Sequence, residues 1–518
     1  MQGSAATGVN SPESPLADIQ APDFAKAKRW DGLFVILASS SYLYINLFTL
    51  RGVPFLLSGD QVFYWMDAQR MIAGDRIYRD FFKFTPPGTD LLYFWVFRLF
   101  GLRIWVPNLV VFILGVALTS LCFRISLLFL KRSYALLAAS LFLVQIYGVL
   151  LNATHHWVSE MLVLAAVAVL MGGRNETRIT GSATFFTQTR GPAALAGVIA
   201  YIAWEQRFTH ESWKLSFKRI ALLCVAFFVA WSALCSYFLA TVGWRRLWYW
   251  WIVFVTRYKV TGANALGFPG GALDSHNLRS GVLPLVVYLA LPIAYLWSLW
   301  VCWGDRRKPL ALSTERRMIL TFVGIATALE VALSPNWLRV YCVAAPGILL
   351  LVWILSRVRW RQRFLYALIW IALVCLASHQ TWSRHHGLNV LVQLPAGDAL
   401  TTKVAAEKLE WIGRHTVPGD YFFQPAWPGV YMPLRLSTPI YAEGFGTTDD
   451  TRPEFVRDGI HRLETIQVRY ILWTPRLESP GDPTHPETYH LAPFLDFLRK
   501  HYRRVLVFSD RDEIWERM

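Results

Sequence analysis

The sequence predicts an all-α polytopic membrane protein with about 11 transmembrane helices and a small C-terminal extracytoplasmic α/β domain. Three observations lead to this prediction. Apolar residues make up 54% of the 518 residues, whereas charged residues make up only 17%. Apolar runs of roughly membrane-crossing length fill the chain as far as residue 378. The remaining residues are polar, rich in Pro and Gly, and patterned like a water-soluble domain.

The apolar runs give the predicted spans, because a bilayer core about 30 Å thick is crossed by about 20 apolar residues in a helix. The runs that fit are 32–50, 104–123, 134–151, 155–172, 192–204, 220–241, 282–303, 318–334, 340–355 and 364–378. A shorter run, 179–189, ends in the breaker Thr189-Arg190-Gly191-Pro192. We interpret it as a half-span that turns at the far surface and returns as 192–204. Such a break survives at membrane depth only where protein or a water-filled cavity covers the freed backbone groups.

The cationic residues give the orientation. The net charge of +16 could indicate a nucleic-acid partner, but Lys and Arg lie in short loops between apolar runs, as the positive-inside rule requires. We therefore predict a bilayer as the partner and no nucleic acid. If 179–189 counts as a span, these loops all face the cytoplasm of an inner (plasma) membrane. The predicted domains are a disordered cytoplasmic tail at 1–30, a transmembrane domain at 31–380 with outer loops 51–103 and 242–281, and an extracytoplasmic domain at 381–518.

The C-terminal segment has its own secondary-structure signals. Ala405, Leu409 and Ile412 repeat at helical spacing, as do the apolar residues between 491 and 502. The strand-like stretches are 421–423, 470–473, 505–508 and 514–515. All six cysteines lie in the apolar runs and none in this segment, which argues against a disulfide framework and a cysteine metal site.

The first outer loop mixes carboxylates and cations with aromatic residues. Asp60, Tyr64 and Asp67 are spaced to share one face of a helix lying on the membrane. Pro86-Pro87-Gly88 forces a turn before 91–100, which is too short to span. The alternative is a solvated surface loop whose charges pair with one another: Arg76, Arg79 and Asp80.

The order of these elements resembles the first outer loop of the GT-C membrane glycosyltransferases. The nearest branch contains the protein O-mannosyltransferases, aminoarabinose transferases and bacterial lipopolysaccharide glycosyltransferases. The matching elements are Gly59-Asp60, Tyr64, Tyr78-Arg79-Asp80-Phe81, Pro86-Pro87-Gly88, Thr187–Pro192, and Pro335–Tyr341 followed by Ala345-Pro346. The resemblance covers roughly residues 30–380. It departs from the family at Asp60-Gln61, where many members have Asp-Glu, and in a shorter 173–191 segment.

The resemblance implies transfer of a sugar from a polyprenyl phosphate to a hydroxyl acceptor, which could be a glycan, a lipid or a protein, with inversion. Asp60 would take the proton of the acceptor hydroxyl, and Asp80 is a second catalytic candidate. Fixed cations would stabilise the leaving phosphate, since Arg is a good planar phosphate partner. The predicted substrate-binding residues are Tyr64, Arg79, Lys83, His155, His156, Arg190, Arg257, Lys259, Arg339 and Tyr341. For Arg257 and Lys259 the alternative is an interfacial anchor beside Trp248–Trp251.

Other interpretations remain open at this point. His155, His156 and Glu160 could bind a metal or sugar hydroxyls, but adjacent histidines are not expected to share one helical face. A divalent metal is therefore a possible cofactor that the sequence does not indicate, and no cofactor is assigned. A transporter or flippase for lipid-linked sugars should carry polar residues along its spans and an inverted repeat, whereas few charges, such as Glu330, lie in these runs. A non-catalytic envelope assembly protein would not need Asp60.

Overall fold

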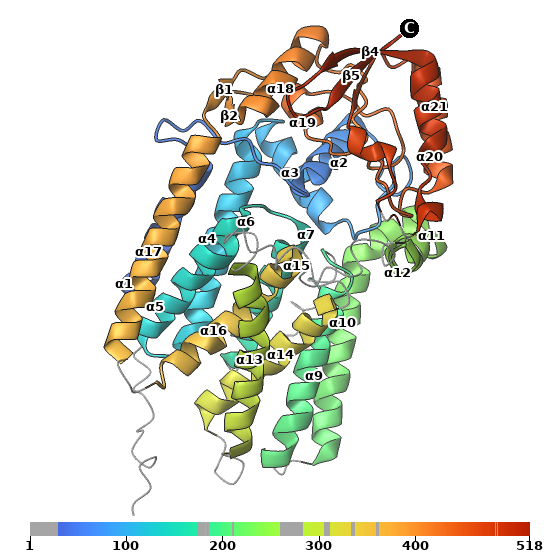
Figure 1. Ribbon diagram of the computed structural model, residues 1–518. Helices are drawn as coiled ribbons and strands as arrows, with labels where there is room; N and C mark the ends of the chain where they lie inside the picture. Colours follow the sequence, from blue (N-terminus) through green and yellow to red (C-terminus); the bar gives the residue numbers. More distant parts are fainter. Residues whose placement is uncertain are drawn as a thin grey trace, which may run out of the picture.

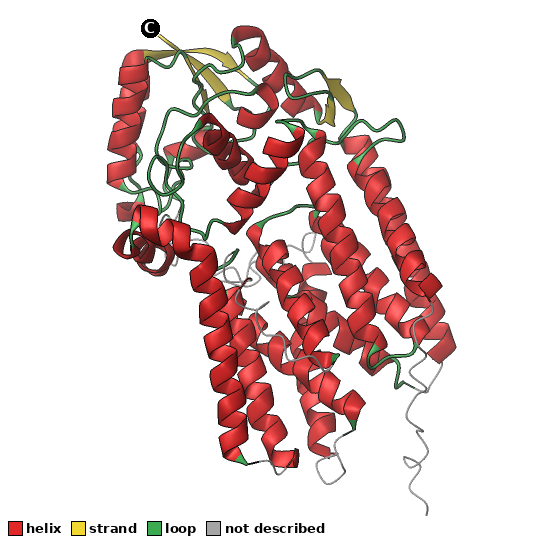
Figure 2. Ribbon diagram, turned by 180° about the vertical axis from the view of Figure 1, so that it is seen from behind, coloured by secondary structure: helices red, strands yellow, loops and turns green. Residues whose placement is uncertain are grey.

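The computed structural model describes residues 29–172, 182, 186–209, 212–258, 283–304, 311–332, 337–358, 362–481, 483 and 485–518. Long helices form one part of the molecule, and the first outer loop and the C-terminal region cover one end of them (Figure 1). The strands lie only at that covered end, as the view from behind shows (Figure 2). The fold therefore places polar loops and strands together at one end of the apolar helices. We call this the outer end, after the predicted orientation.

Each predicted span between 32 and 378 coincides with helical structure. The helices are α1 (Arg29–Leu47), α4 (Trp105–Leu127), α5 (Arg132–Leu141), the π-helix η1 (Phe142–Tyr147), α6 (Gly148–Leu150), α7 (His155–Met171), α9 (Arg190–Thr209), α10 (Trp213–Val242), α13 (Leu283–Gly304), α14 (Leu312–Ala332), α15 (Trp337–Cys342), α16 (Ala344–Leu355) and α17 (Gln362–Gly387). Within the described residues, 5 helices are long and apolar enough to cross a membrane, and two shorter apolar helices are α7 and α16. The total of about 11 spans remains a prediction, and most of 179–189 lies outside the described residues.

The outward faces of the long helices suit a hydrocarbon solvent. On α10, the side chains of Val225, Phe228 and Val229 are more than half exposed. A soluble monomer rarely exposes so continuous an apolar face, whereas lipid tails solvate it. Inside the bundle, α9 and α14 approach so closely that a Cβ on Gly197 would lie 2.6 Å from the Cα of Val323. Small residues at such crossings are typical of helix packing in membranes.

The first outer loop folds into two short helices, α2 (Gln61–Ala73) and α3 (Gly88–Phe100). Gly59, directly before α2, has φ +89°, a conformation that L side chains rarely adopt. The turn at Gly59 brings Asp60 to the N-terminus of α2. In α3, Trp95 and Leu99 are exposed, as expected of a helix lying at the membrane interface. The described part of the second outer segment forms α11 (Trp244–Trp248), η2 (Tyr249–Phe254) and α12 (Val255–Tyr258).

The C-terminal region combines short helices with two antiparallel sheets. Its elements are β1 (Val390–Val392), β2 (Ala399–Thr401), α18 (Lys403–His415), α19 (Tyr431–Leu434), α20 (Pro453–Ile466), β3 (Tyr470–Trp473), η4 (Pro475–Glu478), η5 (Pro486–Thr488), α21 (Ala492–His501), β4 (Tyr502–Val507) and β5 (Glu513–Arg517). The larger sheet has the order β3-β5-β4. The strands predicted near 470–473, 505–508 and 514–515 are present, but 421–423 makes only isolated bridges. Pro425 and Pro428 come after that stretch and donate no backbone N–H, so a ladder cannot continue through them.

Backbone hydrogen bonds join the C-terminal region to the first outer loop. The Leu56 N–H donates to the Leu400 carbonyl at 2.8 Å, and the Leu400 N–H donates to the Pro54 carbonyl at 2.9 Å. Further along the loop, the Phe82 N–H donates to the Tyr441 carbonyl at 2.8 Å. The two parts are therefore one packed unit at the outer ends of the helices.

Candidate functional site

Helix α2 directs three polar side chains toward the outer ends of the membrane helices. Asp60 is half-buried at its start, and Tyr64 and Asp67 come next at intervals of about one turn, both buried. The Tyr64 hydroxyl lies 2.5 Å from Nδ1 of His155, the first residue of α7. The predicted shared face of α2 is thus present, and it faces the membrane helices and the rest of the first loop.

Lys83 lies behind Tyr64 and is surrounded by carboxylates. Its Nζ is 2.7 Å from Asp67 Oδ2, 3.2 Å from Asp90 Oδ1 and 2.5 Å from Glu443 Oε1. The same Nζ lies 4.2 Å from the centroid of the Tyr64 ring, in cation–π contact. We call Lys83, Asp67, Asp90 and Glu443 the Lys83 cluster. It links α2, α3 and the C-terminal region through one ammonium group that is only 2% exposed.

The titration of the Lys83 cluster results from its burial. Desolvation raises the pKa of Asp67 from 3.8 to about 7, although the nearby Lys83 lowers it in part. Desolvation likewise raises the pKa of Asp90 to about 6. Burial alone would lower the pKa of Lys83, but its carboxylate neighbours outweigh this and raise the pKa well above its usual range. The lysine therefore stays charged, and the cluster takes up a proton close to neutral pH.

Arg190 lies in a second buried group of charges, at the start of α9. Its side chain is 0% exposed, with Nη1 3.5 Å from Glu160 Oε2 and Nε 3.2 Å from Glu330 Oε2. Thr189 also donates a hydrogen bond to Glu330, at 2.5 Å. The sequence places Arg190 at the outer surface as a phosphate ligand; the structure places it inside the protein, between two carboxylates. A charge buried among helices needs such counter-charges, because an unpaired charge is costly there.

Arg339 and Asp60 interact electrostatically. Arg339 is half-buried in α15 and interacts electrostatically with Asp60, Glu330 and Arg190. The predicted catalytic carboxylate therefore interacts with one predicted phosphate-binding arginine, although the two lie far apart in the sequence. We call Asp60, Tyr64, His155 and Arg339 the junction site, since they lie where the membrane helices meet the outer regions.

The two histidines are arranged differently from the expectation. Their ring centroids lie 3.9 Å apart, so the rings of His155 and His156 pack against each other. The expectation that adjacent histidines cannot share one face fails here because His155 begins α7 and Thr154 before it is extended. At that helix start the two rings can turn toward one another.

Several predicted site residues lie elsewhere. Asp80 accepts a hydrogen bond from the Arg76 N–H at 2.8 Å and lies 3.6 Å from Arg79, which is the surface pairing considered as the alternative for this loop. Arg79 lines a separate cavity of about 510 Å³ between α3 and the outer end of α10. Arg257 is exposed and lies near the Tyr258 ring, and Tyr341 is buried in α15. Lys259 lies outside the described residues.

Sequence reasoning missed Asp90 and Glu443. Asp90 lies in the first turn of the mostly apolar α3 and is 0% exposed, so a lone carboxylate in an apolar run was a usable signal. Glu443 belongs to no pattern that the sequence shows. As for a metal, no group of three or more His, Cys, Asp or Glu side chains in the described part of the chain is arranged to hold one.

Comparison with known proteins finds similar structures, but no match by family model or to a curated sequence. The Archaeoglobus fulgidus oligosaccharyltransferase, solved with Zn and sulfate, is 12% identical and covers 93% of this chain and 73% of its own, with a TM-score of 0.53. The same organism's AglB, solved with an inhibitory peptide and a dolichol-phosphate, is 13% identical over 87% and 70%, with a TM-score of 0.51.

A third solved structure matches this chain over nearly the full length of both. ArnT from Cupriavidus metallidurans, bound to undecaprenyl phosphate, is 15% identical and covers 93% of this chain and 97% of its own, with a TM-score of 0.55. The likeness includes the first outer loop and the C-terminal region because so little of either chain is left out. The chain therefore shares its fold with these three solved structures.

Proposed function

We propose that this protein is a glycosyltransferase that moves a sugar from a polyprenyl-phosphate donor to a hydroxyl acceptor on the outer side of the plasma membrane, with inversion. The observation that carries the proposal is the electrostatic interaction of Asp60 with Arg339, in a fold shared with ArnT. Two of the structural neighbours were solved with polyprenyl phosphates, which supports the class of donor.

The chemistry suits the two residues. An acceptor hydroxyl is a weak nucleophile until a base takes its proton, and Asp60 supplies that base. The acceptor oxygen then forms a bond to the anomeric carbon while the bond from that carbon to the phosphate oxygen breaks. The electron pair remains on the phosphate, which gains negative charge next to hydrocarbon. The guanidinium of Arg339 balances that charge, and attack opposite the leaving phosphate inverts the anomeric centre.

The other buried charges support this pair. Lys83 is already surrounded by three carboxylates, so it fixes α2 and α3 in place. Arg190 is shared between Glu160 and Glu330 and interacts with Arg339. In this proposal Glu160 and Glu330 balance the charge of Arg190, which would otherwise repel Arg339. Tyr64 contacts both Lys83 and His155.

Replacing Asp60 by Asn tests the proposal. The change keeps the shape and removes the base, so sugar transfer by the protein in liposomes should fall by about 100- to 10,000-fold. The Asp398→Asn variant, at an exposed turn between β1 and β2, is the matched control and should transfer sugar at the parent rate. Near-normal turnover by a folded Asp60→Asn protein contradicts the assignment, and Asp80→Asn then becomes the variant to pursue.

A further inference from the structure

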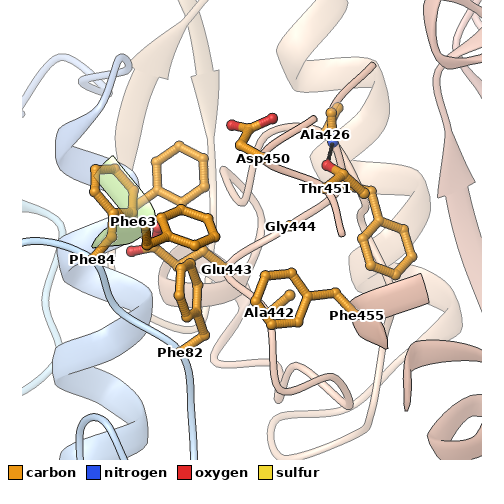
Figure 3. A pocket seen from close by; sticks show the side chains of 13 residues that line it. Phe63, Phe82, Phe84, Ala426, Ala442, Glu443, Gly444, Asp450, Thr451 and Phe455 are labelled. Carbon is orange, nitrogen blue, oxygen red and sulfur yellow. Dashed lines mark hydrogen bonds between the residues drawn. The ribbon is translucent and has the colours of Figure 1, made fainter. Parts of the chain in front are cut away.

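A cavity of about 190 Å³ lies between the first outer loop and the C-terminal region. Figure 3 shows Phe63, Phe82 and Phe84 close together beside Glu443, with Phe455 and Asp450 further along the cavity wall. The ring centroid of Phe82 lies 4.9 Å from that of Phe254 and 4.8 Å from that of Phe455. The cavity wall therefore joins the first loop, η2 and α20, which are far apart in the sequence.

The charged side chains that line the cavity disfavour an anionic ligand. Glu443 and Asp450 are the charged residues among those that line the cavity, and no Lys, Arg or His among the described residues joins them. A phosphate in this cavity would meet two carboxylates, which is unfavourable at such short range. Lys83, which contacts Glu443, is already shared among three carboxylates. The leaving phosphate of the donor therefore belongs beside Arg339, and this cavity suits a ligand without negative charge.

Contacts through Lys83 and Tyr64 link Glu443, in the cavity wall, to the proposed base Asp60. Glu443 contacts Lys83 at 2.5 Å, and Lys83 lies 4.2 Å from the Tyr64 ring. Tyr64 comes about one turn of α2 after Asp60 and interacts with it electrostatically. A molecule held in the cavity would therefore contact Glu443, which is linked to Asp60 through Lys83 and Tyr64.

We infer that this cavity binds the sugar ring of a carbohydrate acceptor, an inference that rests on the proposed transfer reaction. A sugar ring presents C–H groups on its faces and hydroxyl groups at its rim. The Phe82, Phe84 and Phe254 rings match the faces, and the carboxylates of Glu443 and Asp450 accept hydrogen bonds from the rim. The size fits one ring, since an apolar cavity of about 150 Å³ holds benzene.

Binding to the whole protein in lipid nanodiscs tests this inference separately from transfer. The probes are neutral methyl glycosides, inorganic phosphate and a short Ser/Thr-containing peptide, each measured by saturation-transfer NMR. A methyl glycoside should bind to the parent, and to Asp60→Asn, but at least about tenfold more weakly to Phe84→Ala and Asp450→Asn, since both side chains line the cavity. Tyr421→Ala, at an exposed aromatic residue outside the cavity, should bind it like the parent.

Kinetics should agree with the binding result. In Phe84→Ala the KM for a carbohydrate acceptor should rise about tenfold, while binding of the polyprenyl-phosphate donor stays unchanged. The inference is overturned if the parent transfers sugar but binds none of the glycosides, or if the peptide alone binds to the cavity. It is also overturned if both variants bind the glycoside as tightly as the parent. Loss of the proposed transfer activity, by contrast, leaves the glycoside-binding result intact, so the two failures can be told apart.

Discussion

Asp67 sits beside an ammonium group that already has two other carboxylate partners. Burial raises the pKa of Asp67 from 3.8 to about 7, so the folded protein holds a proton that the unfolded chain releases at lower pH. Between these two values the folded state binds more protons, and stability falls as pH rises, by up to about 1.4 kcal/mol per pH unit. Above about pH 7 the carboxyl is ionised in both states, and its contribution to the pH dependence ends.

Replacing Asp67 by Asn should therefore flatten the stability profile between about pH 4 and pH 7. Thermal unfolding of the detergent-solubilised protein across this range measures the effect. The control is Glu410→Gln, which removes an exposed carboxylate from α18 and should leave the slope unchanged. If the stability of Asp67→Asn depended on pH as steeply as that of the parent, another group would be responsible for the pH dependence.

Arg190 tests whether a buried arginine serves stability or phosphate binding. Arg190→Ala leaves Glu160 and Glu330 without their shared cation, which costs about 3–5 kcal/mol for a buried pair. Adding Glu160→Gln should recover part of that loss, because one of the two uncompensated charges is gone. Thermal unfolding and donor binding, measured on the single and double variants, separate the roles. Undiminished stability together with lost donor binding would make Arg190 a direct phosphate ligand.

At the scale of elements, the turn into α2 sets the position of Asp60. Gly59 has φ +89°, and a Cβ built there meets nothing within 4 Å, so Gly59→Ala strains the backbone without a clash. The strain of about 1–2 kcal/mol should shift Asp60 and lower transfer about tenfold, with donor binding retained. Gly397→Ala is the matched control, since Gly397 has φ +114° and equal free space in a turn beside β2. Equal activity losses in both variants would mean that general destabilisation explains the effect.

The helices of the membrane region were largely predictable from the sequence, because the bilayer in which they fold restricts the backbone. In a bilayer every backbone N–H and C=O must be paired within the segment, so an apolar run of sufficient length becomes a helix. The predicted face of α2 was found for a similar reason, because the spacing of Asp60, Tyr64 and Asp67 is local. The stretch 421–423 failed as a strand because the prolines shortly after it cannot extend a ladder. The Lys83 cluster could not be predicted, since Glu443 lies 360 positions from Lys83.

At the scale of the whole molecule, the main prediction concerns the orientation of the chain across the membrane. The Met171 carbonyl, at the end of α7, accepts a hydrogen bond from Arg316, whereas Thr187 donates one to the His155 carbonyl at the start of α7. We therefore predict a cytoplasmic N-terminus and an extracytoplasmic C-terminus.

A reporter fused after Met518 checks this orientation. An enzyme that is active only outside the cytoplasm should be active in the fusion, and a reporter that is active only inside should be silent. The same pair fused before Met1 should give the opposite result and serves as the control. A cytoplasmic C-terminus would remove one span from the predicted number, with 179–189 the first candidate.

The long separation between Lys83 and Glu443 has a consequence for biosynthesis. Ribosomes add about 5–20 residues per second, so roughly 20–70 s pass between the synthesis of these two partners, which are 360 positions apart. Throughout that interval the first loop lacks Glu443, and for most of it the loop also lacks the Leu400 partner of Leu56. A growing chain already inserted in the membrane thus has no finished Lys83 cluster, and the C-terminal region packs onto the first loop only when translation is nearly complete.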